Sequence, residues 1–516
     1  MIKKTINIIK QVLVFIIILF SYTLAFSMNW IFKNFGNIGL EEIMFQINVP
    51  LTNANTDYYY DYAQNALPYI LLCTIITFTL ICFIFKKRVK KIYPKRMKGV
   101  NEKRLTVYKK CRIDKKYIGK LISSLIVLII SFTYTIQKTD FIQYVRQILS
   151  ESTLIKNEYI NTKDVNILFP EEKRNLIYIY LESMEATFYS KENGGAFEDS
   201  LIEDLEELAK ENIVFSNSDT FKGLYALPGA TWTTGAMTAQ TLGLPLKIPI
   251  DRNSYGDYKS FLPGAMGLGE ILQKNGYNQM LAIGSRVEFG GRDHLFKEHG
   301  NYQIFDFNQA VKEEKKDAGD FVWWGFPDSD LFEYAKEKIM LMSEQEMPFN
   351  FTMLTADTHA PDGFKCEECD EEFEEQYFNV LNCSSKKIKQ FVEWIQEQEF
   401  YDNTTIIICG DHTSMQPETF NEIRDSGYER TVVDIIINPA VFPENTKYKY
   451  GSTMDMFPTT LASLGVKIEG NKLGLGTNLF SNEKTLIGKY GLNYVKNELE
   501  KNSNYYNTKL IYGLNQ

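Results

Sequence analysis

The stretch NLIYIYLES (residues 175–183) is a run of apolar residues that ends abruptly in an acid, Glu182. Such a run is typical of a strand that is buried in a sheet. A second run of this kind, TTIIICG (404–410), is followed at once by Asp411 and His412. Open α/β sheets bind ligands at the carboxyl ends of their strands, so we expect these three polar side chains to lie close together.

From about residue 173 onwards, short β-rich runs alternate with longer helical patterns. Strands are predicted at 175–180, 213–218, 277–284, 349–355, 404–410 and 431–438. Helices are predicted at 199–212, 267–276, 328–345 and 384–398. Near-continuous apolar strands that are separated by helices indicate an α/β fold with a mainly parallel central sheet and helices on both of its faces.

Glu182, Asp411 and His412 together offer two carboxylates and one imidazole. This set of oxygen and nitrogen donors suits one divalent metal ion, and Mn²⁺, Mg²⁺ and Zn²⁺ all fit it. The alternative interpretation is that Glu182 is a solvated residue at a strand end and that Asp411 closes a turn.

The segment GATWTTGAM (229–237) offers three threonine hydroxyls between two glycines. A hydroxyl at its ordinary pKa is a weak nucleophile, and coordination to a cation makes its alkoxide accessible. If a helix runs from Thr234 to Leu242, the backbone N–H groups at its start would favour a phosphate. The threonines are equally compatible with a role as helix caps.

Two further side chains suit the recognition of a phosphate. His359 lies between the predicted strand 349–355 and a Pro-Asp-Gly turn, where it could donate a proton to a leaving oxygen or bind phosphate. Arg292 lies among glycines in FGGRDH (289–294), and a guanidinium group suits phosphate. Taken singly, each residue is as compatible with an ordinary surface or core position.

Three apolar stretches precede this region, at about 8–30, 67–85 and 121–136. The first two reach the ~20 residues that a helix needs to cross a bilayer. The third is shorter and contains serines, so a core helix is its alternative, and a cleaved signal peptide is the alternative for the first. We predict a membrane domain at 1–136 and a connector at 137–172. An extracytoplasmic catalytic domain at 173–485 and a C-terminal tail at 486–516 follow.

The basic residues predict the orientation in the membrane. The loop 86–120 holds about sixteen Lys and Arg, whereas the loop between the first two stretches is nearly free of them. The positive-inside rule therefore places the N-terminus and the basic loop in the cytoplasm, with the rest of the chain exported from about residue 137. We expect a multi-pass protein of a bacterial cell (inner) membrane. The net charge is −9 although residues 1–120 are strongly basic, so the exported part is acidic and no nucleic-acid partner is expected.

Three cysteines, Cys366, Cys369 and Cys383, lie in the part that is predicted to be exported. Disulfides persist outside the cytoplasm, so we expect one from Cys369 or Cys366 to Cys383. Half of a zinc site is the alternative for the C-x-x-C pair. Cys409 lies within a strand and is expected to be buried.

These fragments resemble the lipoteichoic acid synthase branch of the alkaline phosphatase/sulfatase superfamily, and within it the phosphoglycerol transferase I type. The similarity runs from about residue 173 to 482. It implies Thr233 as catalytic nucleophile and metal contact, with Glu182, Asp411 and His412 as metal ligands. It also implies that His359 and Arg292 bind the substrate, and it favours Mn²⁺ as the cofactor.

The chain also departs from the patterns of this superfamily. Trp232 precedes the threonine, where lipoteichoic acid synthases carry Lys, and Gly290-Gly291 replaces an aromatic residue. These departures favour the glycan-modifying type over a polymer synthase. The C/S-x-P-x-R motif that sulfatases modify is absent, so sulfatase activity is not expected.

The resemblance implies a membrane-anchored, metal-dependent phosphoglycerol transferase. Such an enzyme would move glycerophosphate from phosphatidylglycerol to a glycan or glycerol-phosphate acceptor through a covalent threonine intermediate, next to the lipid bilayer. One alternative is a phosphoethanolamine transferase or phosphodiesterase on the same fold. Another is a catalytically idle membrane sensor or scaffold.

Overall fold

The computed structural model describes residues 2–35, 57–87, 115–139, 141–247, 260–416, 423 and 426–513. Within these residues the chain divides into two compact units. One holds the N-terminal helices up to Gln143, and the other begins at Tyr144. Most of the basic loop that was predicted at 86–120 lies outside the described residues.

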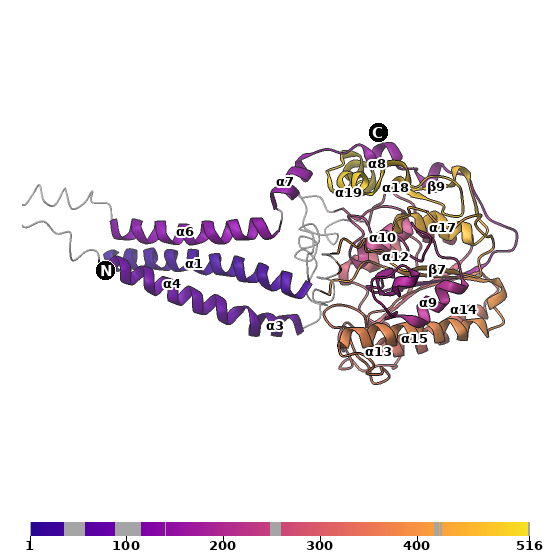
Figure 1. Cartoon of the computed structure of the whole chain (residues 1–516), viewed down its shortest axis with the longest axis horizontal. Helices are drawn as coiled ribbons and strands as arrows, with labels where there is room; N and C mark the ends of the chain where they lie inside the picture. The colour runs from indigo at the N-terminus through magenta and orange to yellow at the C-terminus, as the bar shows by residue number, and fades with distance from the viewer. Residues whose placement is uncertain are drawn as a thin grey trace, which may run out of the picture. The chain divides into compact units, whose positions relative to one another are not determined.

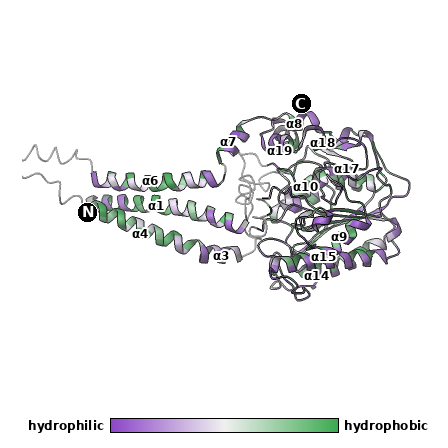
Figure 2. Ribbon diagram, in the orientation of Figure 1, coloured by the Kyte–Doolittle hydropathy of each residue, from purple (hydrophilic) through white to green (hydrophobic). Residues whose placement is uncertain are grey.

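In its described residues the N-terminal unit contains the long apolar helices α1 (Ile2–Phe35), α4 (Leu67–Lys87) and α6 (Lys115–Lys138). The short polar helix α3 (Asp57–Asn65) precedes α4. Three stretches are long and apolar enough to cross a membrane, namely Thr5–Asn34, Tyr58–Phe85 and Lys115–Lys138. The third exceeds the predicted 121–136, and its Ile129 and Ile130 are exposed, which argues against a core helix. Figure 2 shows the apolar residues along these helices.

The second unit is built on a six-stranded sheet. In spatial order the strands are β4 (Gln303–Phe305), β3 (Asn278–Ile283), β5 (Phe349–Leu354), β2 (Asn175–Leu181), β6 (Thr404–Gly410) and β7 (Asp434–Ile437). All pairs are parallel except β6 with β7. Two small antiparallel pairs join β1 (Ile167–Leu168) to β8 (Lys467–Ile468) and β9 (Lys472–Leu473) to β10 (Gly476–Thr477). The predicted α/β fold with a mainly parallel sheet is confirmed.

Helices cover both faces of the sheet, because its strands are apolar on both sides. Tyr178 and Tyr180 of β2 face one core, and Ile177 and Ile179 face the other. The first core is covered by α10 (Thr233–Leu242), α11 (Leu268–Lys274), α12 (Arg292–Glu298) and α17 (Met456–Ser463). The second is covered by α9 (Glu203–Glu211), α13 (Phe307–Lys312), α14 (Asp328–Ser343) and α15 (Gln376–Gln396) (Figure 1).

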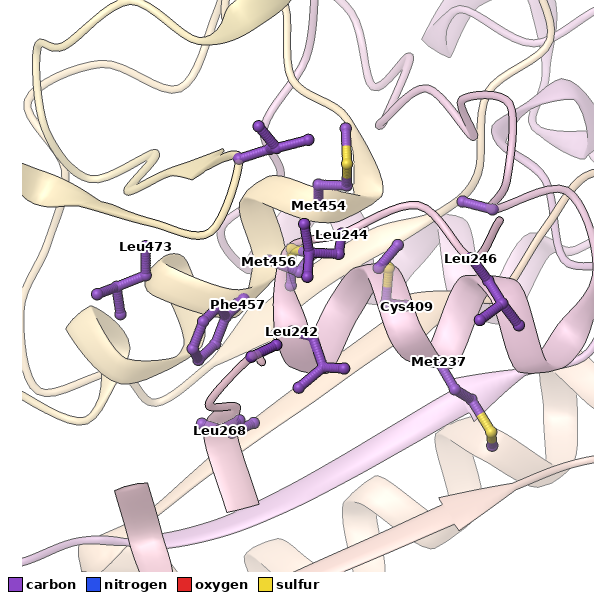
Figure 3. Packing of buried hydrophobic residues seen from close by; sticks show 14 of the residues in the cluster. Met237, Leu242, Leu244, Leu246, Leu268, Cys409, Met454, Met456, Phe457 and Leu473 are labelled. Atoms are coloured by element: carbon purple, nitrogen blue, oxygen red, sulfur yellow. The ribbon is translucent and has the colours of Figure 1, made fainter. Parts of the chain in front are cut away.

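Helix α10, which begins with Thr233, is anchored in the first core. Its Met237 and Leu242 belong to one buried cluster with Met456 and Phe457 of α17 (Figure 3). Every residue of α10 from Thr234 to Leu242 is buried. The start of this helix is therefore held in place by close packing along its length.

The prediction of a strand at 213–218 is wrong. Ile213 makes a single bridge to Ile436. Beyond it, the N–H of Phe215 donates to a carboxylate oxygen of Asp434 at 2.8 Å, and the N–H of Ser216 donates to the carbonyl of Thr446 at 3.0 Å. The backbone N–H groups of Phe215 and Ser216 thus donate to a side chain and to a loop, and the described residues of this segment form no strand ladder. Helix α15 begins at Gln376, eight residues before the predicted start.

The remaining elements are short. They include α7 (Phe141–Leu149), α8 (Leu154–Glu158), α18 (Leu486–Tyr490), α19 (Leu492–Glu500) and a π-helix at Tyr506–Ile511. The 3₁₀ helices lie at Thr162–Asp164, Ala186–Phe188, Lys191–Asn193, Phe289–Gly291, Tyr401–Asn403, Thr453–Asp455 and Glu469–Asn471.

The C-terminal tail packs into the first core. Val495, Leu499 and Tyr506 are buried in the same cluster as the residues of α10 and α17. The hydroxyl of Tyr506 donates to the carbonyl of Pro245 at 2.6 Å, just after α10. The segment that we predicted as a C-terminal tail thus packs in the same cluster as α10.

A disulfide joins Cys369 to Cys383 of α15, and Cys366 is a free, buried thiol. The Sγ of Cys366 lies 2.9 Å from the Nζ of Lys387. The disulfide thus ties the loop before α15 to the helix itself.

We expect the double variant Cys369→Ser/Cys383→Ser to unfold at a lower temperature. Closing a loop of this length contributes about 3 kcal/mol by restricting the unfolded chain. The measurement is thermal unfolding of the full chain in detergent. Cys366→Ser, which leaves the disulfide intact, is the matched control. Equal midpoints for the double variant and the unmodified chain would contradict the prediction.

Candidate active site

The candidate site lies at the carboxyl edge of the three central strands. Glu182 follows β2, His359 lies in the loop after β5, and Asp411 and His412 follow β6. Thr233 is the first residue of α10, which covers this edge on one side. Parallel neighbours in the order β5-β2-β6 bring these strand ends together although they are far apart in sequence.

The side chains of Thr233, Glu182 and His412 converge. The Thr233 hydroxyl donates to Oε2 of Glu182 at 3.3 Å and lies 3.5 Å from Nε2 of His412. That nitrogen is 3.6 Å from Oε1 of Glu182 and 3.4 Å from Oδ2 of Asp411. The donor atoms of Glu182, Asp411 and His412 all lie within 4.8 Å of one another. The sequence prediction that these four residues meet agrees with this geometry.

The three candidate ligands have the chemistry of a cation site. They are buried, and Oδ2 of Asp411 accepts no hydrogen bond from the part of the chain that the structure describes. The other oxygen, Oδ1, accepts from the N–H groups of Ser183 at 2.9 Å and His412 at 2.6 Å. Nδ1 of His412 lies 3.0 Å from the carbonyl of Thr413, so its N–H faces away and the Nε2 lone pair faces the site. A divalent cation fits this set.

The pKa of Asp411 reflects two carboxylates buried next to each other. Burial, and next the charge of Glu182, raise the pKa of Asp411 to about 7. Burial would also raise the pKa of Glu182, but the imidazoles of His359 and His412 bring it below its ordinary value. Two buried carboxylates repel each other, and a divalent cation between them would remove that cost.

Three hydroxyl side chains that we did not predict hold Glu182. Ser183 donates to its Oε1 at 2.7 Å, Thr355 accepts from its N–H at 3.0 Å, and Thr358 donates to its carbonyl at 2.5 Å. Thr355 and Thr358 belong to the segment TADTHA, which carries His359. The loop after β5 and the end of β2 are therefore fixed to each other.

Arg292 begins α12 and is buried, with Nε donating to the carbonyl of Phe289 and Nη2 to that of Arg286, both at 2.9 Å. Burial lowers its pKa to about 10, against the opposing charge of Glu182. Gly290 has φ of 70°, and a Cβ there would lie 2.6 Å from Oγ1 of Thr234. A side chain at this position would thus collide with Thr234, because the loop of Arg292 touches the start of α10.

His359 is partly exposed, and burial lowers its pKa, with Glu182 opposing and His412 adding to the shift. Its Nδ1 lies 2.6 Å from the carbonyl of Ala360. The ring centroids of His359 and Trp324 lie 4.6 Å apart, and those of Trp324 and Phe289 lie 5.2 Å apart. This row of rings links the loops of His359 and Arg292. No signal in the sequence pointed to Trp324, which comes from an irregular segment before α14.

A pair of buried acids fixes the loop of His359 to α14. Asp328 accepts hydrogen bonds from the N–H groups of Ala356 at 2.8 Å and Asp357 at 2.9 Å. Asp357 in turn accepts from the N–H of Asp328 at 3.2 Å. Burial raises the pKa of Asp328 to about 6. Nothing in the sequence indicated this pair, because each acid alone looks like a helix or turn residue.

Comparison with known proteins identifies a family model and curated proteins that match this chain. Residues 174–466 match the family model described as Sulfatase. Phosphoglycerol transferase I of Escherichia coli (strain 55989 / EAEC) is 31% identical over 330 residues, which cover 62% of this chain and 41% of that protein. The protein of the same name from Shigella boydii serotype 18 shows the same identity and coverage. The match thus spans about two fifths of the length of these curated relatives.

Among solved structures, the lipoteichoic acid synthase LtaP from Listeria monocytogenes is similar to this chain. The match covers 64% of this chain and 82% of that chain, with 16% identity and a TM-score of 0.49. The family model, in contrast, matches more than half of the chain and includes the six strands of the central sheet and the candidate site residues. The protein therefore belongs to the sulfatase family.

Proposed function

We propose that the protein is a membrane-anchored phosphoglycerol transferase. It takes glycerophosphate from phosphatidylglycerol and passes it to a glycan or glycerol-phosphate acceptor, through a covalent intermediate on Thr233. One observation carries the proposal: a partly exposed hydroxyl at the start of a buried helix lies 3.3 Å and 3.5 Å from two buried candidate metal ligands. The relatives named phosphoglycerol transferase I supply the class of reaction.

The candidate spans support a lipid donor. A phospholipid leaves the bilayer at a high cost, so an enzyme that is tethered to the same bilayer meets it at a high effective concentration. Three apolar helices precede the catalytic unit, and in the proposed topology that unit faces outwards. An outward-facing site would reach phosphatidylglycerol and cell-envelope acceptors together.

Glu182, Asp411 and His412 would hold one divalent cation, which we expect to be Mn²⁺, with Mg²⁺ and Zn²⁺ also compatible with these donors. When bound, the cation would lower the pKa of the Thr233 hydroxyl and offset negative charge on the phosphoryl group. The backbone N–H groups at the start of α10 add positive potential at the same place.

In the first half of the reaction, the Thr233 oxygen bonds to phosphorus and the ester bond to diacylglycerol breaks. His359 moves the proton. Because burial lowers its pKa, its ring is neutral near pH 7, and the contact of Nδ1 with the carbonyl of Ala360 leaves Nε2 to accept the Thr233 proton. Nε2 then returns that proton to the diacylglycerol oxygen. In the second half, an acceptor hydroxyl gives its proton to Nε2 of His359 and its oxygen bonds to phosphorus. The bond between phosphorus and the Thr233 oxygen breaks, and Nε2 returns the proton to Thr233.

Arg292 binds the non-bridging phosphate oxygens in this proposal. We expect Arg292→Lys to lower the rate of transfer about 10- to 100-fold, because lysine keeps the charge but loses the planar donor set that the carbonyls of Phe289 and Arg286 orient. The measurement is kcat/KM for release of diacylglycerol from phosphatidylglycerol. Lys297→Ala, an exposed change on the same helix, is the control. Equal rates for Arg292→Lys and the unmodified enzyme would remove Arg292 from the site.

The proposed function is tested by the intact mass of the full chain after incubation with Mn²⁺ and mixed phospholipids in detergent. A mass gain of one glycerophosphoryl group, mapped to Thr233, would support the donor, the nucleophile and the two-step chemistry together. A phosphoethanolamine adduct would replace the proposed donor by phosphatidylethanolamine. Absence of any adduct, together with absence of cation binding, would overturn the enzymatic proposal in favour of an idle sensor.

A further inference from the structure

Helix α7 (Phe141–Leu149, FIQYVRQIL) leaves three large apolar side chains exposed. No residue of this helix is buried. Ile142 is 63% exposed and Leu149 is 82% exposed, and Phe141 is exposed as well. Folded proteins seldom leave several large apolar side chains exposed on one short helix unless that surface binds something.

The helix has two distinct faces. At about 100° per residue, one arc holds only apolar or aromatic side chains, and the other holds only polar ones. The apolar arc consists of Phe141, Ile142, Tyr144, Val145, Ile148 and Leu149. The polar arc consists of Gln143, Arg146 and Gln147. A helix with one apolar face and a polar face that carries a cation is suited to the boundary between water and lipid.

The place of α7 in the sequence indicates at which water–lipid boundary it lies. Only Thr139 and Asp140 separate it from Lys138, the last residue of the candidate span α6. Three Cα–Cα steps of ~3.8 Å reach at most about 11 Å, so α7 begins at the level where that span leaves the hydrocarbon. The exposed Arg146 on the polar arc would then reach the phosphates of the headgroups.

We propose that α7 lies in the plane of the outer bilayer interface, with Ile142 and Leu149 inserted among the acyl chains. This inference rests on the membrane insertion in the proposed function. It deepens that function, because the helix keeps the start of the catalytic unit at the depth where the donor's phosphodiester lies. The occupant of the apolar face is thus phospholipid.

The first test places the photo-cross-linking amino acid p-benzoylphenylalanine at single positions of the full chain, expressed in a bacterial membrane. Positions 142 and 149 are expected to cross-link to phospholipid, and position 143, on the polar arc, is not. Position 130, in the candidate span, separates the two hypotheses. Absence of lipid at 130 would overturn the membrane insertion itself. Lipid at 130 with protein cross-links at 142 and 149 would overturn only the inference for α7, in favour of a protein partner or a second copy.

The second test measures transfer. Ile142→Glu/Leu149→Glu should lower release of diacylglycerol from phosphatidylglycerol in vesicles at least tenfold, because the two apolar side chains that enter the lipid are lost. The same variant should hydrolyse a water-soluble phosphodiester at the unmodified rate. Gln143→Glu, on the polar arc, is the matched control. Equal loss on vesicles and on the soluble ester would indicate a folding defect and overturn the lipid role.

Discussion

Thr233→Ala is expected to abolish transfer, with a fall in kcat of at least about 10⁴-fold. In the proposed function the hydroxyl is the nucleophile, and its loss removes the covalent route. The N–H groups at the start of α10 and the ligands Glu182 and His412 are untouched, since alanine is a good helix former at the first position of a helix. The measurement combines the rate of diacylglycerol release with the intact mass of the protein.

Two control variants separate chemistry from folding. Thr233→Ser keeps a hydroxyl near Oε2 of Glu182 and should retain activity within about tenfold and still form the adduct. Thr231→Ala changes a threonine two residues earlier in the same segment and should leave the rate nearly unchanged. If Thr233→Ala retained full transfer activity, the covalent mechanism would be wrong.

Asp411→Asn is expected to lower activity by at least about 10³-fold through loss of the cation. The substitution keeps an oxygen for the N–H groups of Ser183 and His412 but replaces the second carboxylate oxygen by an amide that points a donor at the site. Chelation of the metal in the unmodified enzyme should have the same effect, and added Mn²⁺ should reverse that loss but not the loss in Asp411→Asn.

Stability offers an independent measurement of the same site. A ligand that binds only the folded state stabilises it by about 2.7 kcal/mol at 100 times its Kd. Mn²⁺ should therefore raise the unfolding temperature of the unmodified chain and leave that of Asp411→Asn nearly unchanged. Asp402→Asn, an exposed acid at the opposite end of β6, is the matched control and should respond as the unmodified chain does. An equal rise in all three proteins would argue against a cation on Asp411.

Most of the prediction of the candidate site depended on the acids at the ends of two strands. Glu182 and Asp411 each follow a seven-residue strand with a mostly apolar centre, and such strands are buried in parallel sheets. An acid at that point is therefore visible in the sequence, and the parallel order brings the ends together. The convergence of Glu182, Asp411 and His412 follows from this arrangement of strand ends, and the place of Thr233 beside them was implied by the family resemblance.

The parts that could not be predicted depend on contacts between distant loops. Trp324 reaches His359 from an irregular segment, and nothing in its local sequence marks it. The pairing of Asp328 with Asp357 is likewise visible only once α14 is placed beside the loop after β5. Residues 213–218 look like a strand because they are apolar at first, yet their hydrogen bonds go to Asp434 and Thr446. Local propensity does not reveal such tertiary partners.

The burial of the C-terminal residues has a consequence for how the enzyme is made. Tyr506, Leu510 and Ile511 complete the apolar cluster on which α10 rests, so this core stays open until these residues have emerged. In the proposed topology it emerges outside the cell, where the unfinished sheet would expose apolar surface during export. A nascent chain that is cut short before these residues would thus present Thr233 on an unsupported helix. In the proposed function, synthesis past Ile511 is therefore a condition for a formed active site.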